Sequence, residues 1–305
     1  AEYRLDHATA LALTVGTVQI SNKAIVQAAL DAYELLTIDA QAQLTAEKAL
    51  LDSLSAKIVL LEATAAVVTA ESTYLQADHD QALIKVNALP ASADKTSLLD
   101  RLTAVQDTIN TQKAAAVQSL IAALPSTGAV VLSNQAQIEA ARTAYNALTS
   151  TQKALVTNLS VLVSVEAEYA ALVTATNAVV TAETSKLQAD VTIAQALVTA
   201  LSNGTAKTAL QTRLTAVQNI IDVNSAKTLI QNYFAANSVV VTRLNSNSLK
   251  ETAFRTKANE VVAGLGVTIT ITNTNYISRT NTIYTIQIVK GSASVTMTVS
   301  VTFTR

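Results

Sequence analysis

Apolar residues recur at helical spacing over most of the chain and at a spacing of two near its end. One stripe consists of Val26, Ala29, Tyr33 and Leu36. Steps of three, four and three positions are the period of an α-helix with one buried face. Between Val267 and Phe303, apolar residues alternate with Thr and other polar residues, which is typical of half-buried strands. The pattern predicts a mostly α protein with a small C-terminal α+β domain.

The helical part of the chain is a tandem duplication. The segment RLTAVQ occurs at Arg101–Gln106 and again at Arg213–Gln218, 112 residues later, and the same offset carries Tyr33 onto Tyr145. Of the 44 positions in the range Ala66–Ile109, 24 are identical to their partners without a gap. Repeats of this kind bury apolar faces within each unit and against its neighbour. We therefore expect tandem helical-bundle repeats that form an elongated rod.

These patterns divide the chain into four segments. Residues 1–17 are a lead-in, and residues 18–125 and 126–240 are two helical repeats with two bundle halves each. Residues 241–305 form the α+β domain. The lead-in is expected to contain a short helix that ends before a turn near Gly16.

Within each repeat the sequence predicts a series of helices separated by polar breaks. Each first helix begins at a Ser-Asn pair, Ser21-Asn22 or Ser133-Asn134, which is favourable N-cap chemistry. Further helices are expected, as separate elements, at Ser55–Glu71, Leu159–Glu183, Lys113–Leu124 and Ser225–Ala236. Pro90 and Asn203-Gly204 mark turns at nearly equivalent positions. The pattern leaves open whether the helix continues through Glu71–Asp78 and Glu183–Asp190.

The C-terminal domain is predicted to be one helix covering a three-stranded antiparallel sheet. The helix spans Ser246–Val262 and ends before the turn at Gly264-Leu265-Gly266. The residues expected near one of its faces are Leu249, Ala253 and Val261. Turns at Asn273–Asn281 and Lys290–Ser292 separate three alternating strands. Three strands make a thin sheet, so we expect the domain also to lean on the preceding repeat.

Composition narrows the class of function. The chain has 305 residues, of which 14% are charged, and its formal net charge is −1. Such a balance provides no general attraction to nucleic acid or to an anionic membrane. There is no Cys, which excludes disulfides, thiolate metal sites and Cys nucleophiles. The most apolar stretch, Ile58–Ala70, contains Glu62 and is expected to be too short and too polar to span a bilayer.

Histidine is the natural place to look for catalysis, and the chain has two, His7 and His79. His79 lies in Asp78-His79-Asp80, a triplet that could hold a divalent cation. The second copy has Asp190-Val191-Thr192 at this place, so the His is not part of the repeated design and a solvated helix surface is the favoured interpretation. The sequence indicates no nucleophile and base held by a third group. We expect no catalytic and no cofactor-binding residues, and we assign no metal ligand.

Four charged residues recur at the repeat offset. The pairs are Glu71/Glu183, Asp78/Asp190, Lys95/Lys207 and Arg101/Arg213. They could form a repeated ligand site, but helix capping or ion pairing within the bundles is the favoured interpretation, and exposed ion pairs contribute only about 0–1 kcal/mol each. Gly264-Leu265-Gly266 precedes a strand, so it predicts a tight turn and not a phosphate loop. The sequons at Asn158 and Asn203 carry no weight alone.

The Thr faces of the C-terminal strands have two interpretations. A strand with an exposed, alternating pattern can accept a further strand from a partner or from a lattice neighbour. It can also be an ordinary solvated face, which is the favoured interpretation.

Two segments resemble a known type of repeat. IEAARTAYNALTSTQKALVTNL at Ile138–Leu159 and ADKTSLLDRLTAVQDTI at Ala93–Ile109 are similar to helical repeats of Gram-positive S-layer and cell-wall surface proteins. The resemblance covers roughly residues 18–235, and the first copy departs from it where IDAQAQLT replaces STQKALVT. It implies an exported, wall-associated structural protein with no catalytic residue to carry over. Proteins of this type often bind Ca²⁺, but the resemblance assigns no site.

The expected function is structural: a non-catalytic spacer or lattice-forming segment of an extracellular bacterial surface-layer protein that contacts copies of itself. The alternative is a binding module for cell-wall polymer or an adhesin segment, which a cluster of exposed tyrosines would favour. Two tyrosines, Tyr33 and Tyr145, are expected inside. The remaining, scattered tyrosines are Tyr3, Tyr74, Tyr169, Tyr233, Tyr276 and Tyr284. An enzyme is the weakest hypothesis, and only a deep pocket lined by His, Asp and Glu would revive it.

Overall fold

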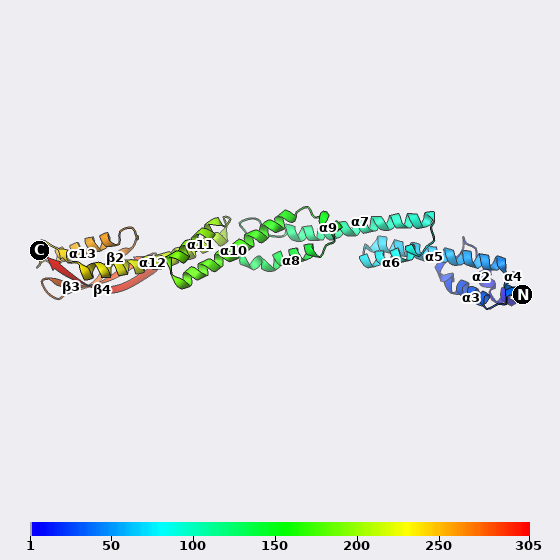
Figure 1. Cartoon of the computed structure of the whole chain (residues 1–305), viewed down its shortest axis with the longest axis horizontal. Helices are drawn as coiled ribbons and strands as arrows, with labels where there is room; N and C mark the ends of the chain where they lie inside the picture. Colours follow the sequence, from blue (N-terminus) through cyan, green and yellow to red (C-terminus); the bar gives the residue numbers. More distant parts are fainter. Residues whose placement is uncertain (1) are drawn as a thin grey trace. The chain divides into compact units, whose positions relative to one another are not determined.

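The structure is a computed structural model that describes residues 2–305, and it confirms a mostly α chain with a C-terminal α+β domain (Figure 1). The α-helices are α1 (Glu2–Asp6), α2 (Ala8–Leu11), α3 (Lys23–Glu34), α4 (Ile38–Ala42), α5 (Thr45–Thr73), α6 (Gln76–Asn87), α7 (Ala93–Ala122), α8 (Gln135–Asn146), α9 (Ser150–Ala154), α10 (Leu159–Ser185), α11 (Gln188–Ala200), α12 (Thr205–Ala236) and α13 (Asn247–Val261). The 3-10 turns are η1 (Ile20–Asn22) and η2 (Leu132–Asn134), and the strands are β1 (Val239–Val240), β2 (Thr268–Tyr276), β3 (Asn281–Lys290) and β4 (Ala293–Thr304).

The chain forms two compact units. One comprises Ala1–Ser119 and Ala144–Thr157, and the other comprises Leu120–Thr143 and Asn158–Arg305.

Two hydrophobic cores of the first unit share one helix. One core joins α1, α2 and α3 to the first half of α5, and includes Tyr33, Leu51 and Ile58. The other joins the second half of α5 to α6 and to the first half of α7, and includes Val67 and Leu102. Helix α5 has 29 residues, which corresponds to a length of about 44 Å. Because it is uninterrupted, helical backbone connects the two cores.

The second unit repeats this construction. Its first core joins α10, α11 and the first half of α12, with Val198 and Leu214 among the buried residues. Its second core joins the second half of α12 to α13 and the sheet, with Ile230, Phe254 and Phe303 buried. Helix α12 has 32 residues, or a length of about 48 Å. The C-terminal domain therefore leans on the preceding repeat through a helix that belongs to both, as expected.

The long helices run through positions where the pattern predicted separate elements. Lys113–Leu124 is not a helix of its own but the end of α7, Ser225–Ala236 is the end of α12, and Ser55 lies inside α5. None of these three helices contains Gly or Pro, so the backbone has no reason to stop. Both halves of α5 and α12 also bury side chains, so packing sustains the helix across each junction.

The helix breaks at the point that the sequence left open, and it does so in the same way in both copies. Directly after α5 and α10, Tyr74 and Lys186 adopt the left-handed conformation, with φ of 52° and 53°. This conformation ends a helix and is costly for residues other than Gly. The next helix, α6 or α11, begins two residues later.

The Ser-Asn pairs mark helix starts, but they do not cap them as expected. Oδ1 of Asn22 accepts a hydrogen bond from the backbone N–H of Gln19, and Oδ1 of Asn134 accepts one from Val131, each at 2.8 Å. Each Asn side chain therefore closes the 3-10 turn that precedes α3 or α8. The following helix receives no side-chain cap from Asn22.

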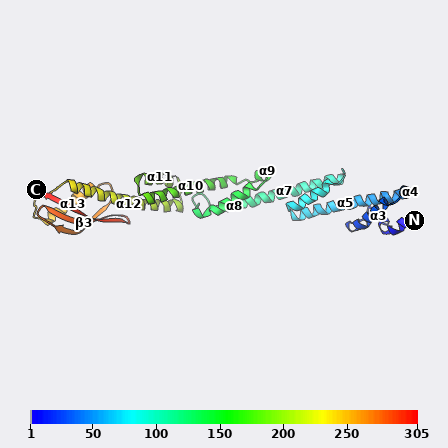
Figure 2. The same ribbon diagram turned by 60° about the horizontal axis from the view of Figure 1, so that its bottom comes forward.

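The sheet has four strands in the order β1-β4-β3-β2, one more than predicted. Strands β2, β3 and β4 form the expected antiparallel meander. The additional strand, β1, pairs in parallel with the end of β4. Two residues are too few for an alternating pattern to reveal. The sheet lies beside the second half of α12 and α13 (Figure 2).

The buried face of α13 is rotated from the predicted face. Lys250, Phe254 and Ala258 are buried, whereas Leu249 is 40% exposed. The rings of Phe254 and Tyr284 are stacked, with their centroids 4.3 Å apart. Aromatic stacking on the sheet therefore sets the rotation of the helix. The other residues of the predicted face, which are partly buried, are Ala253 and Val261.

Candidate functional site

The recurring Glu and Arg residues form the same ion pair in both copies. Nε and Nη2 of Arg101 donate to the two carboxylate oxygens of Glu71 at 2.8 and 2.7 Å, and Arg213 holds Glu183 at the same distances. These hydrogen bonds lower the pKa of both carboxylates. Each pair joins two long helices, α5 to α7 or α10 to α12. Because a bidentate pair occupies both partners, the geometry supports the structural interpretation over a ligand site.

The recurring Lys residues cap helix ends. Nζ of Lys95 donates to two carbonyl oxygens at the C-terminal end of α6, at 2.8 and 2.7 Å. Lys207 makes the equivalent two hydrogen bonds at the end of α11, at the same distances. The last carbonyls of a helix have no partner within it, and a cation is favourable there. Both Lys residues therefore stabilise a helix terminus.

The recurring Asp residues hold the turn that follows each left-handed residue. The hydroxyl of Thr73 donates to Asp78 at 2.7 Å, and the hydroxyl of Ser185 donates to Asp190 at 2.5 Å. The same hydroxyls accept from the backbone N–H two residues further on. Thr73 and Ser185 are different residues that supply the same hydroxyl group. A search for identical residues in the two copies therefore does not find them.

His79 lies in a core and not on a solvated surface, which corrects the expectation. It is 7% exposed, and its counterpart Val191 is also buried. Nδ1 of His79 lies 3.0 Å from a carboxylate oxygen of Asp80, which also accepts from Gln76 at 2.9 Å. Hydrogen bonds lower the pKa of Asp80, and the bond with His79 has a larger effect than the bond with Gln76. His79 therefore packs in the core as Val191 does in the second copy, and its ring nitrogen is hydrogen-bonded to a neighbour.

The triplet Asp78-His79-Asp80 does not converge on a cation site. Asp78 is engaged by the turn at the end of α5, while Asp80 is engaged by His79 and Gln76. Across residues 2–305 no three His, Asp or Glu side chains come together in a group that could hold a metal ion. The residues of a single chain therefore do not fit a Ca²⁺ site built from such groups.

Reciprocal Gln pairs link neighbouring helices in both copies. The amides of Gln76 and Gln106 exchange hydrogen bonds of 2.8 and 3.1 Å between α6 and α7. The amides of Gln188 and Gln218 exchange two of 2.9 Å between α11 and α12. These glutamines are identical in both copies, but they carry no charge, so a search for recurring charged residues does not find them.

The position four residues after the second Gln of each pair differs between the copies, and it contacts a different partner in each. Asn110 accepts from Gln106 at 3.1 Å and from Gln152 at 3.0 Å. Its counterpart Asp222 accepts from Gln218 at 2.9 Å and from Lys290 at 2.5 Å. A neutral amide thus meets an amide, and a carboxylate meets an amine. A search for residues that are identical in both copies does not find this position, because Asn110 and Asp222 differ.

A groove of about 670 Å³ lies between α11 and α12 and reaches Lys290. A second reciprocal amide pair, Gln195 with Gln211 at 2.7 and 2.8 Å, forms part of its wall. In the first copy these two positions are Leu83 and Leu99. The residues that line the groove include no His, Asp or Glu. It is therefore not the kind of pocket that would revive the enzyme hypothesis.

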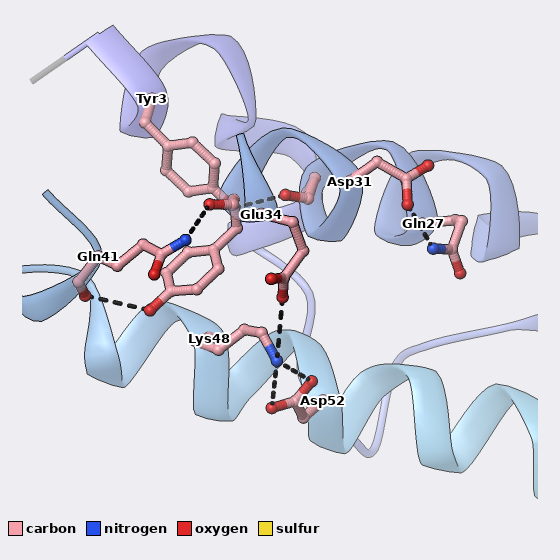
Figure 3. A network of polar contacts seen from close by, with 9 residues as sticks. Tyr3, Gln27, Asp31, Glu34, Gln41, Lys48 and Asp52 are labelled. Carbon is pink, nitrogen blue, oxygen red and sulfur yellow. Dashed lines mark hydrogen bonds and ion pairs between the residues drawn. The ribbon is translucent and has the colours of Figure 1, made fainter. Parts of the chain in front are cut away.

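Tyrosines are used mainly inside the bundles. Tyr3 donates to the carbonyl of Ala29 at 2.7 Å, and Tyr33 donates to the carbonyl of Gln41 at 3.1 Å (Figure 3). The ammonium of Lys48 lies over the Tyr33 ring, 5.7 Å from its centroid. The two exposed tyrosines, Tyr74 and Tyr276, belong to different units. No exposed aromatic cluster of the kind that would favour a binding module is visible within either unit, as far as residues 2–305 show.

Within residues 2–305, two helices are long and apolar enough to cross a membrane by length and composition alone. They are α5 and α10, with 18-residue windows of mean hydropathy 1.5 and 1.3. The stretch Ile58–Ala70 is part of α5, so it is not too short to span a bilayer, contrary to the prediction. One face of each helix packs in a bundle core, and Glu62 of α5 pairs with Lys23 at 2.8 Å. The absence of membrane insertion therefore stays a prediction, now based on packing and ion pairing.

No protein-family model, curated protein or solved structure matches this chain.

Proposed function

We propose that the chain is a structural, non-catalytic segment of an extracellular bacterial surface-layer protein, where it acts as a spacer or a lattice-forming element. The observation that carries the proposal is the sharing of one uninterrupted helix by two cores, α5 in the first unit and α12 in the second. A part that holds a distance needs stiff junctions between its modules. Continuous helical backbone supplies stiffness that a linker of Gly or Ser does not.

Polar contacts at the junctions add support. In α12 the junction between the two cores carries the pair of Asp222 with Lys290, which ties the helix to the sheet. Glu71–Arg101 and Glu183–Arg213 brace the long helices against each other. The surface-layer setting itself rests on the resemblance of Ile138–Leu159 and its neighbours to Gram-positive surface-protein repeats.

Stiffness at a junction can be measured directly because the chain has no native Cys. Spin labels on Cys introduced at the exposed positions Ile193 and Thr298 would report the distance between the bundle and the sheet of the second unit. A control pair uses Thr192 and Thr208, two exposed positions on α11 and α12 of the same bundle. It gives the width of the distance distribution that comes from motion of the labels themselves. We expect distance distributions of similar width for the two pairs. A much broader distribution for the first pair would contradict the spacer.

The surface-layer role is tested with purified Gram-positive cell walls, with and without their secondary polymers, in Ca²⁺ and in chelator. Ordered sheets or oligomers in electron micrographs, without binding to walls, are the expected result for a lattice-forming element. Specific co-sedimentation with walls would replace this proposal by the binding module. The absence of both would leave the spacer alone.

A binding module for cell-wall polymer is the second candidate, and the groove between α11 and α12 favours it. Its wall carries four glutamines, Gln188, Gln195, Gln211 and Gln218. Side-chain amides both donate and accept, as hydroxylated polymers require. The four amides are paired with one another, however, so a ligand would have to displace those hydrogen bonds.

A further inference from the structure

The two edges of the C-terminal sheet are covered differently. In the order β1-β4-β3-β2, helix α12 packs against β4 and strand β1 pairs with it at Phe303 and Thr304, whereas β2 has a neighbouring strand on one side only. Strand β2 contains no buried residue, while alternate residues of β3 are buried along most of its length. An edge strand presents unpaired backbone N–H and C=O groups. Strand β2 is therefore an open edge.

The sequence of this edge lacks the usual protection against pairing. No Lys, Arg, Asp, Glu or Pro occurs from Val267 to Ile277. Protein edges are commonly blunted by such residues or by bulges. The one protective device is a register shift between Ile271 and Asn273, which leaves the segment Thr268–Ile271 regular. This segment alternates Thr with Ile, a composition of high β-propensity.

The apolar face of the sheet extends to the edge without being fully covered. Ile269 and Ile271 pack against the core formed with α12 and α13, but both remain partly exposed. Further along, Tyr276 and Ile277 are exposed. A strand added beside β2 would continue the sheet and cover the remaining apolar surface of these two isoleucines.

We propose that β2 pairs antiparallel with β2 of a second copy of this chain, around a two-fold axis at Thr270. This proposal deepens the lattice-forming part of the proposed function and rests on it. In this register Thr270 lies opposite its own counterpart, and Ile269 of one copy lies opposite Ile271 of the other. A register displaced by one residue would place Ile opposite Thr, on the wrong face of the sheet.

A second copy fits this edge for two reasons. A two-fold contact brings each residue near its own equivalent, so a charged edge would repel itself, and this one has no charge. The alternation is symmetric about Thr270, so the apolar face of one copy continues into that of the other. The contact is short, so a weak dimer is expected, and it would be reinforced where several copies are held together.

Disulfide trapping tests the register. Residues opposite each other in an antiparallel pair have Cα atoms about 4.5–5.5 Å apart, within disulfide range. A Thr270→Cys variant should therefore form disulfide-linked dimers under mild oxidation. The matched control is Thr285→Cys, a partly exposed Thr on β3, which is paired with β2 on one side and with β4 on the other. Equal trapping of both variants, or of neither, would overturn the proposed contact.

A charge variant tests the association without oxidation. Thr270→Lys places two ammonium groups opposite each other in the dimer and should weaken association by about tenfold or more, as measured by sedimentation equilibrium of the full chain. Thr285→Lys, on the strand between β2 and β4, should leave association unchanged, and circular dichroism checks that both variants fold. A chain that is monomeric at all concentrations, or a dimer indifferent to Thr270→Lys, would contradict the proposal.

If ordered sheets still form with Thr270→Lys, the lattice-forming function stands and its contact lies elsewhere. If the dimer forms but no larger assembly does, the β2 contact stands and the lattice fails.

Discussion

Lys290 at the end of β3 donates from Nζ to the carboxylate of Asp222 on α12 at 2.5 Å. The Asp222 side chain is 11% exposed and the Lys290 side chain 28% exposed. Lys290 also donates to the carbonyl of Leu265 at 2.7 Å. One amine thus joins the helix, the sheet and the loop after α13, at the middle of the helix that two cores share.

Replacing Lys290 by Met should destabilise the second unit, because it leaves the carboxylate of Asp222 largely buried with Gln218 as its side-chain donor. We expect the free energy of unfolding to fall by about 1–3 kcal/mol. Chemical denaturation followed by circular dichroism measures the loss. In the background of Asp222→Asn the same replacement should cost less, and an equal cost in both backgrounds would show that the two side chains are not coupled.

The first copy offers a matched control for that junction. Asn110→Asp introduces the carboxylate of the second copy opposite Gln152, which carries no charge. We expect this variant to be less stable than the natural chain, because a buried carboxylate without a cation is costly. A gain in stability would contradict the view that each junction is matched to its own partner.

Gly204→Ala should destabilise the second unit through a steric clash alone. A Cβ atom at Gly204 would lie 1.8 Å from the carbonyl oxygen of Gly128, while φ of 175° is accessible to any residue. The backbone must shift, at a cost of about 1–3 kcal/mol. Gly16→Ala is the control, because the nearest atom to its Cβ would be 3.8 Å away and the change should stay within about 0.5 kcal/mol. Thermal unfolding of the two variants compares the sites.

Lys186→Gly should stabilise the protein, because Lys186 is exposed and left-handed at the end of α10. Relief of the conformational penalty is worth up to about 1 kcal/mol. The neighbouring Leu187→Gly, at φ of −92°, should instead lower stability. Melting temperatures of the two variants should move in opposite directions, and a common direction would argue against the left-handed turn.

Acid should weaken the braces between long helices. The pKa values of Glu71 and Glu183 are lowered in the folded state by their Arg partners. The unfolded state therefore binds more protons near the ordinary value of 4.5, and stability rises with pH through that region. The contribution is complete above the ordinary pKa and is lost as the pH falls through the lowered folded values. The double variant Glu71→Gln, Glu183→Gln should lose less stability than the natural chain when the pH falls from about 5 to about 3. Urea denaturation of both proteins at these two pH values measures the difference.

Comparison of the two copies predicts many of the structural contacts from sequence. Four charged residues recur in the second copy, and each forms the same contact as its counterpart there: Glu71, Asp78, Lys95 and Arg101. The comparison failed where the copies differ for a reason. Identity between the copies does not single out Asn110, and it predicts a solvated surface for His79 because the second copy has no His at this position.

The class of each element and the repeat of 112 residues follow from the amino-acid sequence alone, because helical and alternating periods and duplication are read directly along the chain. Long-range packing sets which helices merge, which face of α13 is buried, and that β1 joins the sheet. These outcomes depend on partners far apart in sequence, such as Phe254 with Tyr284 and Asp222 with Lys290. Packing energy between distant residues has no local signature, whereas the period of an amphipathic element does.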